Sequence, residues 1–245
     1  MTAPPSGSPP SLSCENLNAG WADTQVVSDV SFKVERGETL AILGRNGVGK
    51  TTLLSTIVGR ARWRSGAILH DGTPIERMPT YARARRGIGF VPQEREIFRS
   101  LSVQENLAIA FQPRAASDAQ WSMEKIYELF PRLHERQTNS GNQLSGGEQQ
   151  MLSIGRALIG NPSLMLMDEP MEGLAPVIVD QLVEALHKIR KQSAMTIVLI
   201  EQHVELALEF ASHIIVMDRG QIVYRNEAAT SADRTIIENL IGVGA

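Results

Sequence analysis

The segment at positions 44–51, GRNGVGKT, carries residue types that could bind phosphate groups. It fits the pattern of Gly, four residues and Gly-Lys-Thr, between a short apolar run and a helical pattern. Glycines let backbone N–H groups point at phosphates, and the N-terminus of a following helix adds partial positive charge. We expect Lys50 to reach the β- and γ-phosphates of a nucleotide and the Thr51 hydroxyl to ligate Mg²⁺. The other residues expected to hold the nucleotide are Gly44, Arg45, Asn46, Gly47, Val48, Gly49 and Thr52.

A second chemical feature is the pair of carboxylates in SLMLMDEP, at positions 163–170. Its apolar residues predict a buried strand, and ligands bind at the carboxyl ends of such strands in parallel sheets. Asp168 would hold Mg²⁺ directly or through water, and Glu169 would orient and deprotonate an attacking water. Alone, such a pair more often begins a helix, but beside GRNGVGKT the catalytic interpretation is favoured.

These two segments fit a kinase, a GTPase or an ATPase. A GTPase would need an Asn-Lys-x-Asp segment to read guanine, and the sequence has none. A kinase would leave unexplained the segment QLSGGEQQ at 143–150, and no acceptor-site signature supports it. That segment is itself suited to an anion, because Ser145 can cap a helix that follows and Gly146 and Gly147 allow close approach.

The elements that must position these residues alternate along the chain. Strands are expected at DVSFKV, TLAILG, GAILHDG, IGFV, SLMLMD, TIVLIE and HIIVMD. Helical spacing follows at 50–59, in SVQENLAIA, where a serine is placed as N-cap, and in DAQWSMEKIYELFPRL. Strands that alternate with helices predict an α/β protein with a parallel, doubly wound sheet, interrupted by a helical insertion from about 94 to 158.

Composition excludes several other classes of protein. The 245 residues include 24 Lys and Arg against 27 Asp and Glu, and the net charge of −3 argues against a dedicated nucleic-acid binder. Cys14 is the one cysteine, so no internal disulfide forms, which fits a reducing compartment. No apolar run approaches the roughly 18 residues that cross a bilayer. The beginning, MTAPPSGSPPSLS, does not resemble a signal peptide, and its Pro and Ser content predicts a disordered tail over 1–11.

The order of four motifs resembles the ATP-binding cassette family. These motifs are GRNGVGKT, VPQ at 91–93, LSGGEQQ at 144–150 and MDEP at 167–170, and LSGGE is highly specific to that family. The resemblance extends from about Leu12 to Val243. It implies a P-loop NTPase (RecA-like) core with a mainly parallel sheet, an N-terminal antiparallel β part and an inserted α-helical subdomain. It also implies ATP and Mg²⁺ as cofactors.

The resemblance implies one nucleotide-binding domain over 12–243, with an ATP-binding core at 12–93 and 159–243 and a helical signature subdomain at 94–158. In this family two such domains pair head to tail, and each ATP lies between the P-loop of one chain and the LSGGE turn of the other. The residues expected to contact the partner's ATP are therefore Leu144, Ser145, Gly146, Gly147 and Glu148. By itself the chain should be a weak ATPase.

Three further site positions follow from the same resemblance, one of them with two alternative residues. Gln93 matches the glutamine that contacts Mg²⁺ or the lytic water and links the core to the helical insertion. Trp21 stands where the family places an aromatic that stacks on adenine, or else it is a surface anchor. In LIEQHVE the γ-phosphate switch falls on Gln202 when the later MDRG is aligned, with His203 as the alternative. A glutamine can donate a hydrogen bond there but does not titrate near neutral pH.

Departures from the common family pattern indicate one branch. Ala175 stands where most cassettes have an aspartate, Met151 where most have an arginine, and Gln202 where most have a histidine. Together with GIGFVPQEREIF and SVQENL, these features resemble the second, shorter ATPase of branched-chain amino-acid importers. The same branch is also used for urea and short amides.

That branch implies a sister ATPase or a second copy of this chain as partner, two transmembrane permease subunits and, indirectly, a periplasmic solute-binding protein. The chain would lie in the cytoplasm, on the inner membrane, and its helical insertion would receive a permease helix. Ile97, Phe98 and Leu101 are either exposed contacts for that helix or ordinary core. A DNA-repair or ribosome-associated cassette is the alternative, but only about fifty residues separate Gln93 from Leu144, without the heptads of a coiled-coil arm.

Overall fold

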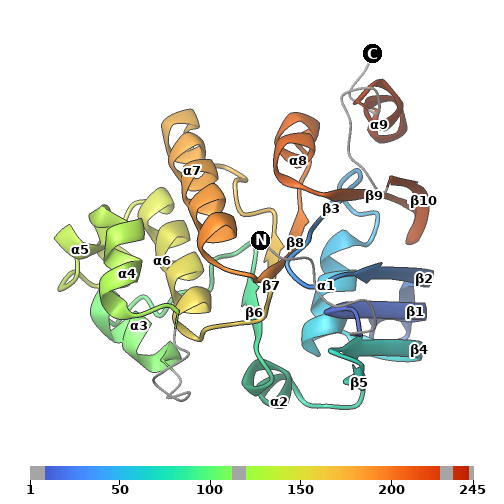
Figure 1. The fold of residues 1–245 in the computed structure, drawn as a ribbon, viewed down its shortest axis with the longest axis horizontal. Coiled ribbons are helices and arrows are strands. Elements are labelled where there is room, and N and C mark those ends of the chain that lie inside the picture. Colours follow the sequence, from blue (N-terminus) through green and yellow to red (C-terminus); the bar gives the residue numbers. More distant parts are fainter. Residues whose placement is uncertain (1–8, 112–119, 227–233, 243–245) are drawn as a thin grey trace.

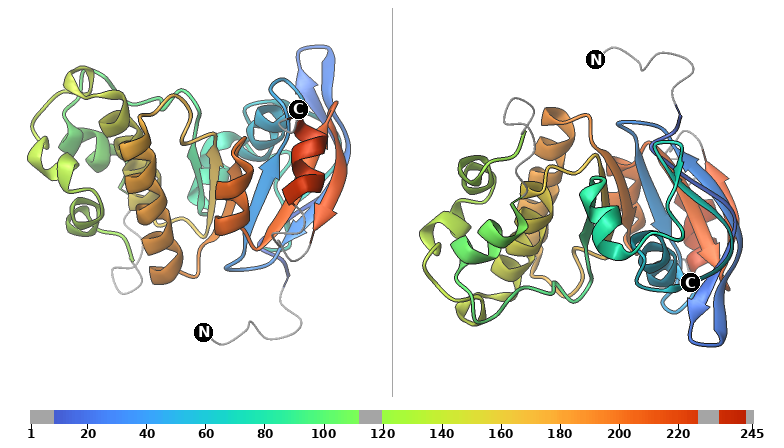
Figure 2. Two further views of the ribbon diagram at one scale, coloured as in Figure 1. Left: turned by 90° about the horizontal axis from the view of Figure 1, so that it is seen from above. Right: turned by 90° about the horizontal axis from the view of Figure 1, so that it is seen from below.

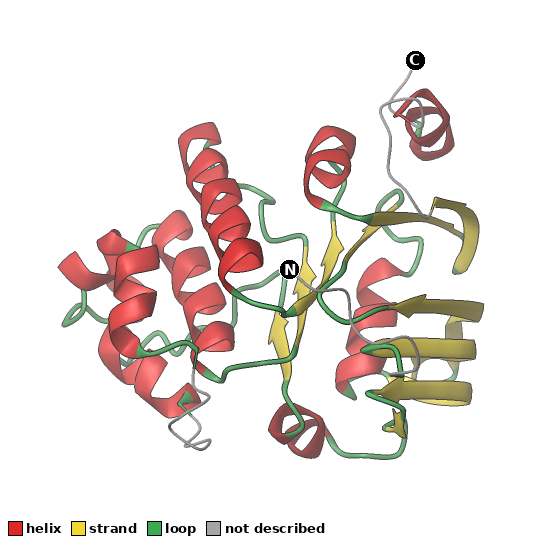
Figure 3. Ribbon diagram, in the orientation of Figure 1, coloured by secondary structure: helices red, strands yellow, loops and turns green. Residues whose placement is uncertain are grey.

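The computed structural model describes residues 9–111, 120–226 and 234–242. Within these residues the strands form two sheets, one of six strands and one of four (Figures 1 and 3). Most of the tail expected at 1–11, and Val243 at the far boundary, lie outside them. In the same part of the chain no helix is long and apolar enough to span a bilayer.

The six-stranded sheet has the order β10-β9-β3-β8-β7-β6 within the described residues, and its neighbours pair in parallel except β10 with β9. The three central strands are buried along their whole length, because helices or the second sheet cover both faces. The strands are β3 (Thr39–Leu43), β6 (Ile88–Val91), β7 (Leu164–Asp168), β8 (Thr196–Ile200), β9 (His213–Asp218) and β10 (Gln221–Asn226).

The antiparallel sheet has the order β2-β1-β4-β5 and is built from β1 (Leu12–Trp21), β2 (Thr24–Val34), β4 (Arg62–His70) and β5 (Thr73–Pro74). Helix α1 (Lys50–Val58) joins it to the large sheet. Its apolar residues Leu53, Leu54 and Ile57 belong to one buried cluster with side chains of both sheets. The helix that follows the phosphate-binding segment is therefore held from two sides.

Helix α2 (Thr80–Arg85) packs beside α1, since its Arg83 donates to the carbonyl oxygens of Thr56 and Ile57. The remaining helices lie on the other side of the large sheet or beyond its β6 edge (Figure 1). Figure 2 shows the helices between residues 100 and 160 at one end of the molecule and the antiparallel sheet at the other. The described helices other than α1 and α2 are α3 (Val103–Ala110), α4 (Met123–Leu129), α5 (Pro131–Glu135), α6 (Gly146–Ile159), α7 (Pro176–Gln192), α8 (Val204–Phe210), α9 (Arg234–Ile241) and a short 3₁₀ turn at Gly141–Gln143.

The predicted fold class is confirmed, with one local difference. The segment DAQWSMEKIYELFPRL has helical spacing, and the structure divides its helical part into α4 and then α5, which begins at Pro131. Proline lacks the N–H that would continue a helix, and its ring clashes with the preceding turn. Ser122 caps α4 by accepting a hydrogen bond from the N–H of Lys125, so the helix begins later than its apolar spacing suggests.

Candidate functional site

The phosphate-binding segment connects the end of β3 to the start of α1. Gly44 has φ +152°, and a Cβ there would lie 2.5 Å from the carbonyl oxygen of Met217, so the segment needs glycine at this position. Gly49 is the N-cap of α1 with φ +108°, and within the described chain no side chain caps this helix. The first N–H groups of α1 are thus left for an anion.

The Lys50 ammonium lies inside this turn. Its Nζ donates to the carbonyl oxygens of Gly44 at 2.8 Å and Arg45 at 3.0 Å. It also lies 3.1 Å from Oε1 of Glu169, and the Lys50 side chain is only 4% exposed. A buried ammonium paired with a buried carboxylate is a strong local interaction, because little water screens it. The structure therefore brings the predicted phosphate-binding lysine and the predicted base together.

Asp168 and Thr51 meet at the ends of β7 and the phosphate-binding segment. The Thr51 hydroxyl donates to Oδ1 of Asp168 at 3.1 Å. Burial raises the pKa of Asp168 from 3.8 to about 6, while the hydrogen bond from Thr51 opposes that rise. A hydroxyl and a carboxylate this close form a suitable oxygen donor set for Mg²⁺, which takes one or two protein oxygens beside phosphates and waters.

Glu169 is the meeting point of the remaining predicted catalytic residues. Its Oε2 accepts hydrogen bonds from Nε2 of Gln202 at 2.8 Å and from Nε2 of Gln93 at 3.5 Å. The side chain is buried and its backbone has φ +47°, a left-handed conformation that is uncommon outside glycine. Gln93 also donates to Oε2 of Glu172. Amide donors on both sides hold this carboxylate in one place.

The two alternatives for the switch residue differ in what they contact. Gln202 reaches Glu169, whereas Nδ1 of His203 lies 3.3 Å from Oε2 of Glu201 and its side chain is 71% exposed. The structure thus places the glutamine beside the predicted base and the histidine at the surface of the turn. This geometry supports the alignment on Gln202.

A cavity of about 340 Å³ lies beside Lys50, Thr51 and Glu169. Nine residues line it: Val26, Asn46, Gly47, Gly49, Lys50, Thr51, Thr52, Gln93 and Glu169. Trp21 lies beside it, since its Nε1 donates to the Thr52 hydroxyl at 3.1 Å, and the ring is 47% exposed. As far as the structure describes the chain, no residue of 144–148 lines this cavity. Six of the predicted nucleotide residues therefore line one cavity, whereas Gly44, Arg45, Val48 and the LSGGE turn do not.

The LSGGE turn begins α6 with a capping box. The Ser145 hydroxyl accepts from the N–H of Glu148 at 3.3 Å, and Oε2 of Glu148 accepts from the N–H of Ser145 at 2.7 Å. Leu144 is buried, while Ser145 is exposed. A Cβ on Gly147 would lie 2.8 Å from Cγ2 of Ile178 in α7. A larger residue here would therefore have to displace the Ile178 side chain even without a ligand.

Sequence reasoning missed three residues at the site. Val26 comes from the antiparallel sheet and lines the cavity, and only the tertiary fold brings it there. Glu172 accepts a hydrogen bond from the side-chain amide of Gln93. The signal that could have identified it is its position three residues after Glu169, in the turn that follows. Glu201 is buried beside the switch turn, and a charged residue directly after the apolar run TIVLI was the signal there.

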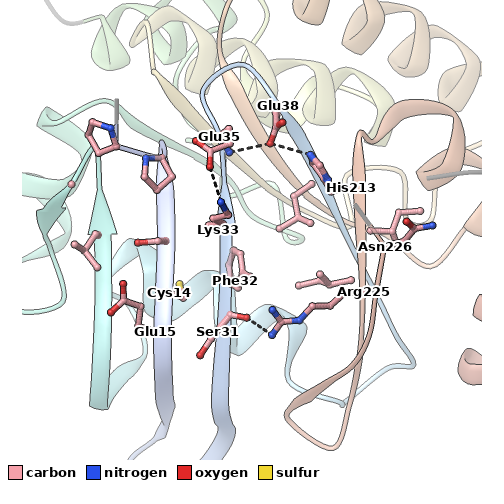
Figure 4. Close-up of a pocket in the computed structure, with 18 residues that line it drawn as sticks. Cys14, Glu15, Ser31, Phe32, Lys33, Glu35, Glu38, His213, Arg225 and Asn226 are labelled. Atoms are coloured by element: carbon pink, nitrogen blue, oxygen red, sulfur yellow. Dashed lines mark hydrogen bonds and ion pairs between the residues drawn. The ribbon is translucent and has the colours of Figure 1, made fainter. Parts of the chain in front are cut away.

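A larger cavity, of about 680 Å³, lies elsewhere in the described residues (Figure 4). It is near the amino ends of β3 and β9, whereas the phosphate-binding segment follows the carboxyl end of β3. Two side-chain contacts join residues of its lining: Lys33 with Glu35 at 3.3 Å, and His213 with Glu38 at 3.0 Å. Arg225 donates to the carbonyl oxygen of Ser31. None of the predicted site residues line this cavity.

Residues 27–172, more than half of the chain, match the protein family described as ABC transporter. The chain belongs to this family. It is 40% identical to the high-affinity branched-chain amino acid transport ATP-binding protein BraG of Pseudomonas aeruginosa, over 89% of this chain and 93% of BraG. It is 31% identical to the probable branched-chain amino acid transport ATP-binding protein LivF of Archaeoglobus fulgidus, over 91% and 95%. It is also 35% identical to the lipopolysaccharide export system ATP-binding protein LptB of Escherichia coli, over 86% and 88%.

Solved ABC structures share the fold. An ATP-binding cassette of an ABC transporter in its ADP conformation superposes with TM-score 0.77 at 25% identity, covering 97% of this chain and 100% of that one. A dimeric cassette in a post-hydrolysis state, bound to ADP and phosphate, superposes with TM-score 0.74 at 25% identity, over 88% and 97%. This ABC protein is thus an ATP-binding ATPase subunit, as its family and relatives establish.

Proposed function

We propose that this ABC protein is the energy-coupling ATPase of an importer of branched-chain amino acids. The observation that carries this proposal is the 40% identity to BraG over nearly the full length of both proteins, against 35% to 36% for LptB proteins. The substitutions at Met151, Ala175 and Gln202, which resemble the same importer branch, support it independently. The proposed place is the cytoplasmic face of the inner membrane.

Uptake by cells tests this proposal. In the organism that carries this gene, its deletion should abolish high-affinity uptake of labelled leucine, isoleucine and valine. The wild-type chain should restore uptake, and Lys50→Ala should not. Undiminished leucine uptake together with lost urea or short-amide uptake would move the proposal to that solute. If uptake of the amino acids, urea and short amides were all undiminished and lipopolysaccharide were lost from the cell surface, the proposed function would change from import to lipopolysaccharide export.

We propose that hydrolysis uses Thr51, Asp168 and Gln93 around Mg²⁺ and Glu169 as the base. Mg²⁺ would neutralise charge on the β- and γ-phosphates. The close approach of Thr51 to Asp168 supports this donor set. Lys50 would turn from Glu169 toward the phosphates as the nucleotide enters, which frees Glu169 to accept a proton from water.

We propose that two cassettes pair head to tail around ATP and that hydrolysis lets them separate. The support is that residues 144–148 do not line the chain's own described nucleotide cavity, although Ser145 is exposed at the start of a helix. A head-to-tail contact closed by a two-fold axis creates two equivalent sites. The partner would be a second copy or a sister ATPase, and the resulting dimer would drive two permease subunits.

Trapping the ATP-bound state tests this pairing. Glu169→Gln removes the base but keeps the hydrogen-bonding shape, so ATP should stay intact and hold the dimer closed. With ATP and Mg²⁺, light scattering should give about twice 26.9 kDa, the mass of one chain. A mass of one chain under saturating ATP would count against self-pairing, and Lys50→Ala in the same background serves as the control that cannot be trapped.

The permeases would contact the helical lobe, here defined as α3 to α6 and the segment before α3. Of the three apolar candidates, Phe98 is 45% exposed and Leu101 is half-buried, whereas Ile97 packs against the buried cluster that the lobe shares with α7 and the large sheet. Phe98 is therefore the residue proposed to meet a permease helix. The proposed subdivision remains a core at 12–93 and 159–243 with a helical subdomain at 94–158.

A further inference from the structure

Glu201 lies between the two loops that form the nucleotide site. It follows β8, the strand between β3, which leads to the phosphate-binding segment, and β7, which leads to Asp168 and Glu169. The Glu201 N–H donates to the carbonyl oxygen of Ile42 at 3.2 Å, and the Ile200 carbonyl accepts from the N–H of Glu169 at 3.1 Å. The backbone at this point is thus fixed to both neighbouring strands.

The Glu201 carboxylate is buried, with the residue only 2% exposed. Its Oε2 accepts a hydrogen bond from the backbone N–H of Gln202 at 3.2 Å and lies 3.3 Å from Nδ1 of His203. Its Oε1 is buried without a hydrogen-bond partner among the residues that the structure describes. Burial raises the pKa of this carboxyl, and the contact with His203 opposes the rise.

The burial of such a carboxylate does not itself stabilise the fold. A buried charge with an unpaired oxygen costs free energy, and an apolar side chain of similar size is often neutral or stabilising at such a place. A role for Glu201 is therefore expected in function, through the group that its hydrogen-bonded oxygen, Oε2, contacts. That oxygen holds the backbone of Gln202, whose side chain donates to Oε2 of Glu169 at 2.8 Å.

We propose that Glu201 is a positioning residue for hydrolysis, because its carboxylate fixes the turn that aims the Gln202 amide at the Glu169 carboxylate. Glu201 touches neither nucleotide nor water in this proposal and acts only through Gln202. The proposal rests on Glu169 as the base in the proposed hydrolysis and on Gln202 as the switch residue expected from the sequence, whose amide donates to Glu169. The switch turn would then depend on two residues: Gln202, which contacts the base, and Glu201, which directly follows β8 and holds Gln202 in place.

A double-mutant cycle on the purified full-length chain tests this inference. Glu201→Leu removes the acceptor, and we expect kcat for ATP to fall about tenfold while KM changes less than threefold. In the Gln202→Ala background the same substitution should change kcat less than twofold, since the side chain that it positions is already gone. Glu201→Gln keeps an acceptor oxygen and should retain kcat within about threefold of wild type.

Stability separates positioning from a structural role. The thermal midpoint of Glu201→Leu should not fall below that of Glu209→Ala, a matched carboxylate control on α8 whose partner is His187 at the surface. Glu209→Ala should keep wild-type kcat.

Three results would overturn the proposal. Glu201→Leu could lower kcat equally with and without Gln202, which places its effect elsewhere. It could lower the midpoint and kcat together, which makes it structural. Gln202→Ala could leave kcat unchanged, which removes the role of Gln202 and the inference with it. In the first two results Gln202→Ala still lowers kcat, so the proposed mechanism survives while the inference fails.

Discussion

Asp168→Asn should make the folded chain more stable while it destroys turnover. Asp168 is buried at the end of β7, and burial raises its pKa from 3.8 to about 6. A carboxyl whose pKa is higher in the folded state favours folding when protonated and opposes folding when ionised. The free-energy cost that ionised Asp168 imposes on folding is absent well below pH 3.8, grows as pH rises, and reaches its full value above about pH 6. Asparagine keeps the shape and an acceptor for Thr51 without the charge.

The magnitude follows from the size of the pKa shift. A rise of about two units corresponds to about 3 kcal/mol at pH 7.5, at 1.36 kcal/mol per unit. At pH 5 the same shift contributes roughly half as much, because the folded carboxyl is then mostly protonated. The weaker hydrogen bond that Thr51 makes to a neutral acceptor reduces the gain, so we expect Asp168→Asn to add roughly 2 kcal/mol at pH 7.5.

Urea unfolding without nucleotide and with a chelator present measures this difference at pH 7.5 and pH 5. Asp180→Asn, an exposed carboxylate on α7, should stay within about 0.5 kcal/mol of wild type at both values. With Mg²⁺ and ATP, Asp168→Asn should lose about two orders of magnitude in turnover, since the metal contributes several kcal/mol to the transition state. Equal stability at pH 7.5, or a gain that does not shrink at pH 5, would refute the reasoning.

Other substitutions give simpler outcomes. Lys50→Ala should abolish measurable ATP turnover, since the lysine is the cation expected at the β- and γ-phosphates, and unchanged phosphate release would refute the assignment of the phosphate-binding segment. Gln202→Ala should lower turnover about tenfold and His203→Ala less than threefold, and the reverse order would identify the histidine as the switch. Trp21→Ala should raise KM for ATP about tenfold while Trp21→Phe keeps it within threefold, and a similar KM for both would reduce Trp21 to a surface anchor.

Local chemistry explains why much of this site was predictable from sequence. The strand, turn and helix around 44–51 depend on glycines and apolar residues that lie next to one another, and α1 is found at Lys50–Val58 as expected. The same holds for α3, where Ser102 and Glu105 form a capping box within four residues. Asp168 falls at the end of β7 because a buried parallel strand can be recognised from its continuous apolar run.

What sequence could not supply depends on contacts between distant segments. The order in which β8 lies between β3 and β7 places Gln202 and Glu201 beside Glu169, and no local pattern encodes that order. The sequence explains Gly147 by the approach of a ligand alone, whereas packing against Ile178 of α7 also favours a glycine there. The pairing of Gln93 with Glu172 and the approach of Val26 to the cavity arise in the same way.

Mixing two inactive variants tests most directly whether the LSGGE turn serves the ATP of a partner chain. Lys50→Ala disables the phosphate-binding segment and Ser145→Arg blocks the exposed serine at the start of α6, so each self-paired variant should be inactive. In an equal mixture half of the dimers contain one chain of each kind, and one of their two sites is intact. The account predicts recovery of about a quarter of wild-type turnover. A mixture no more active than the two variants measured separately would contradict it.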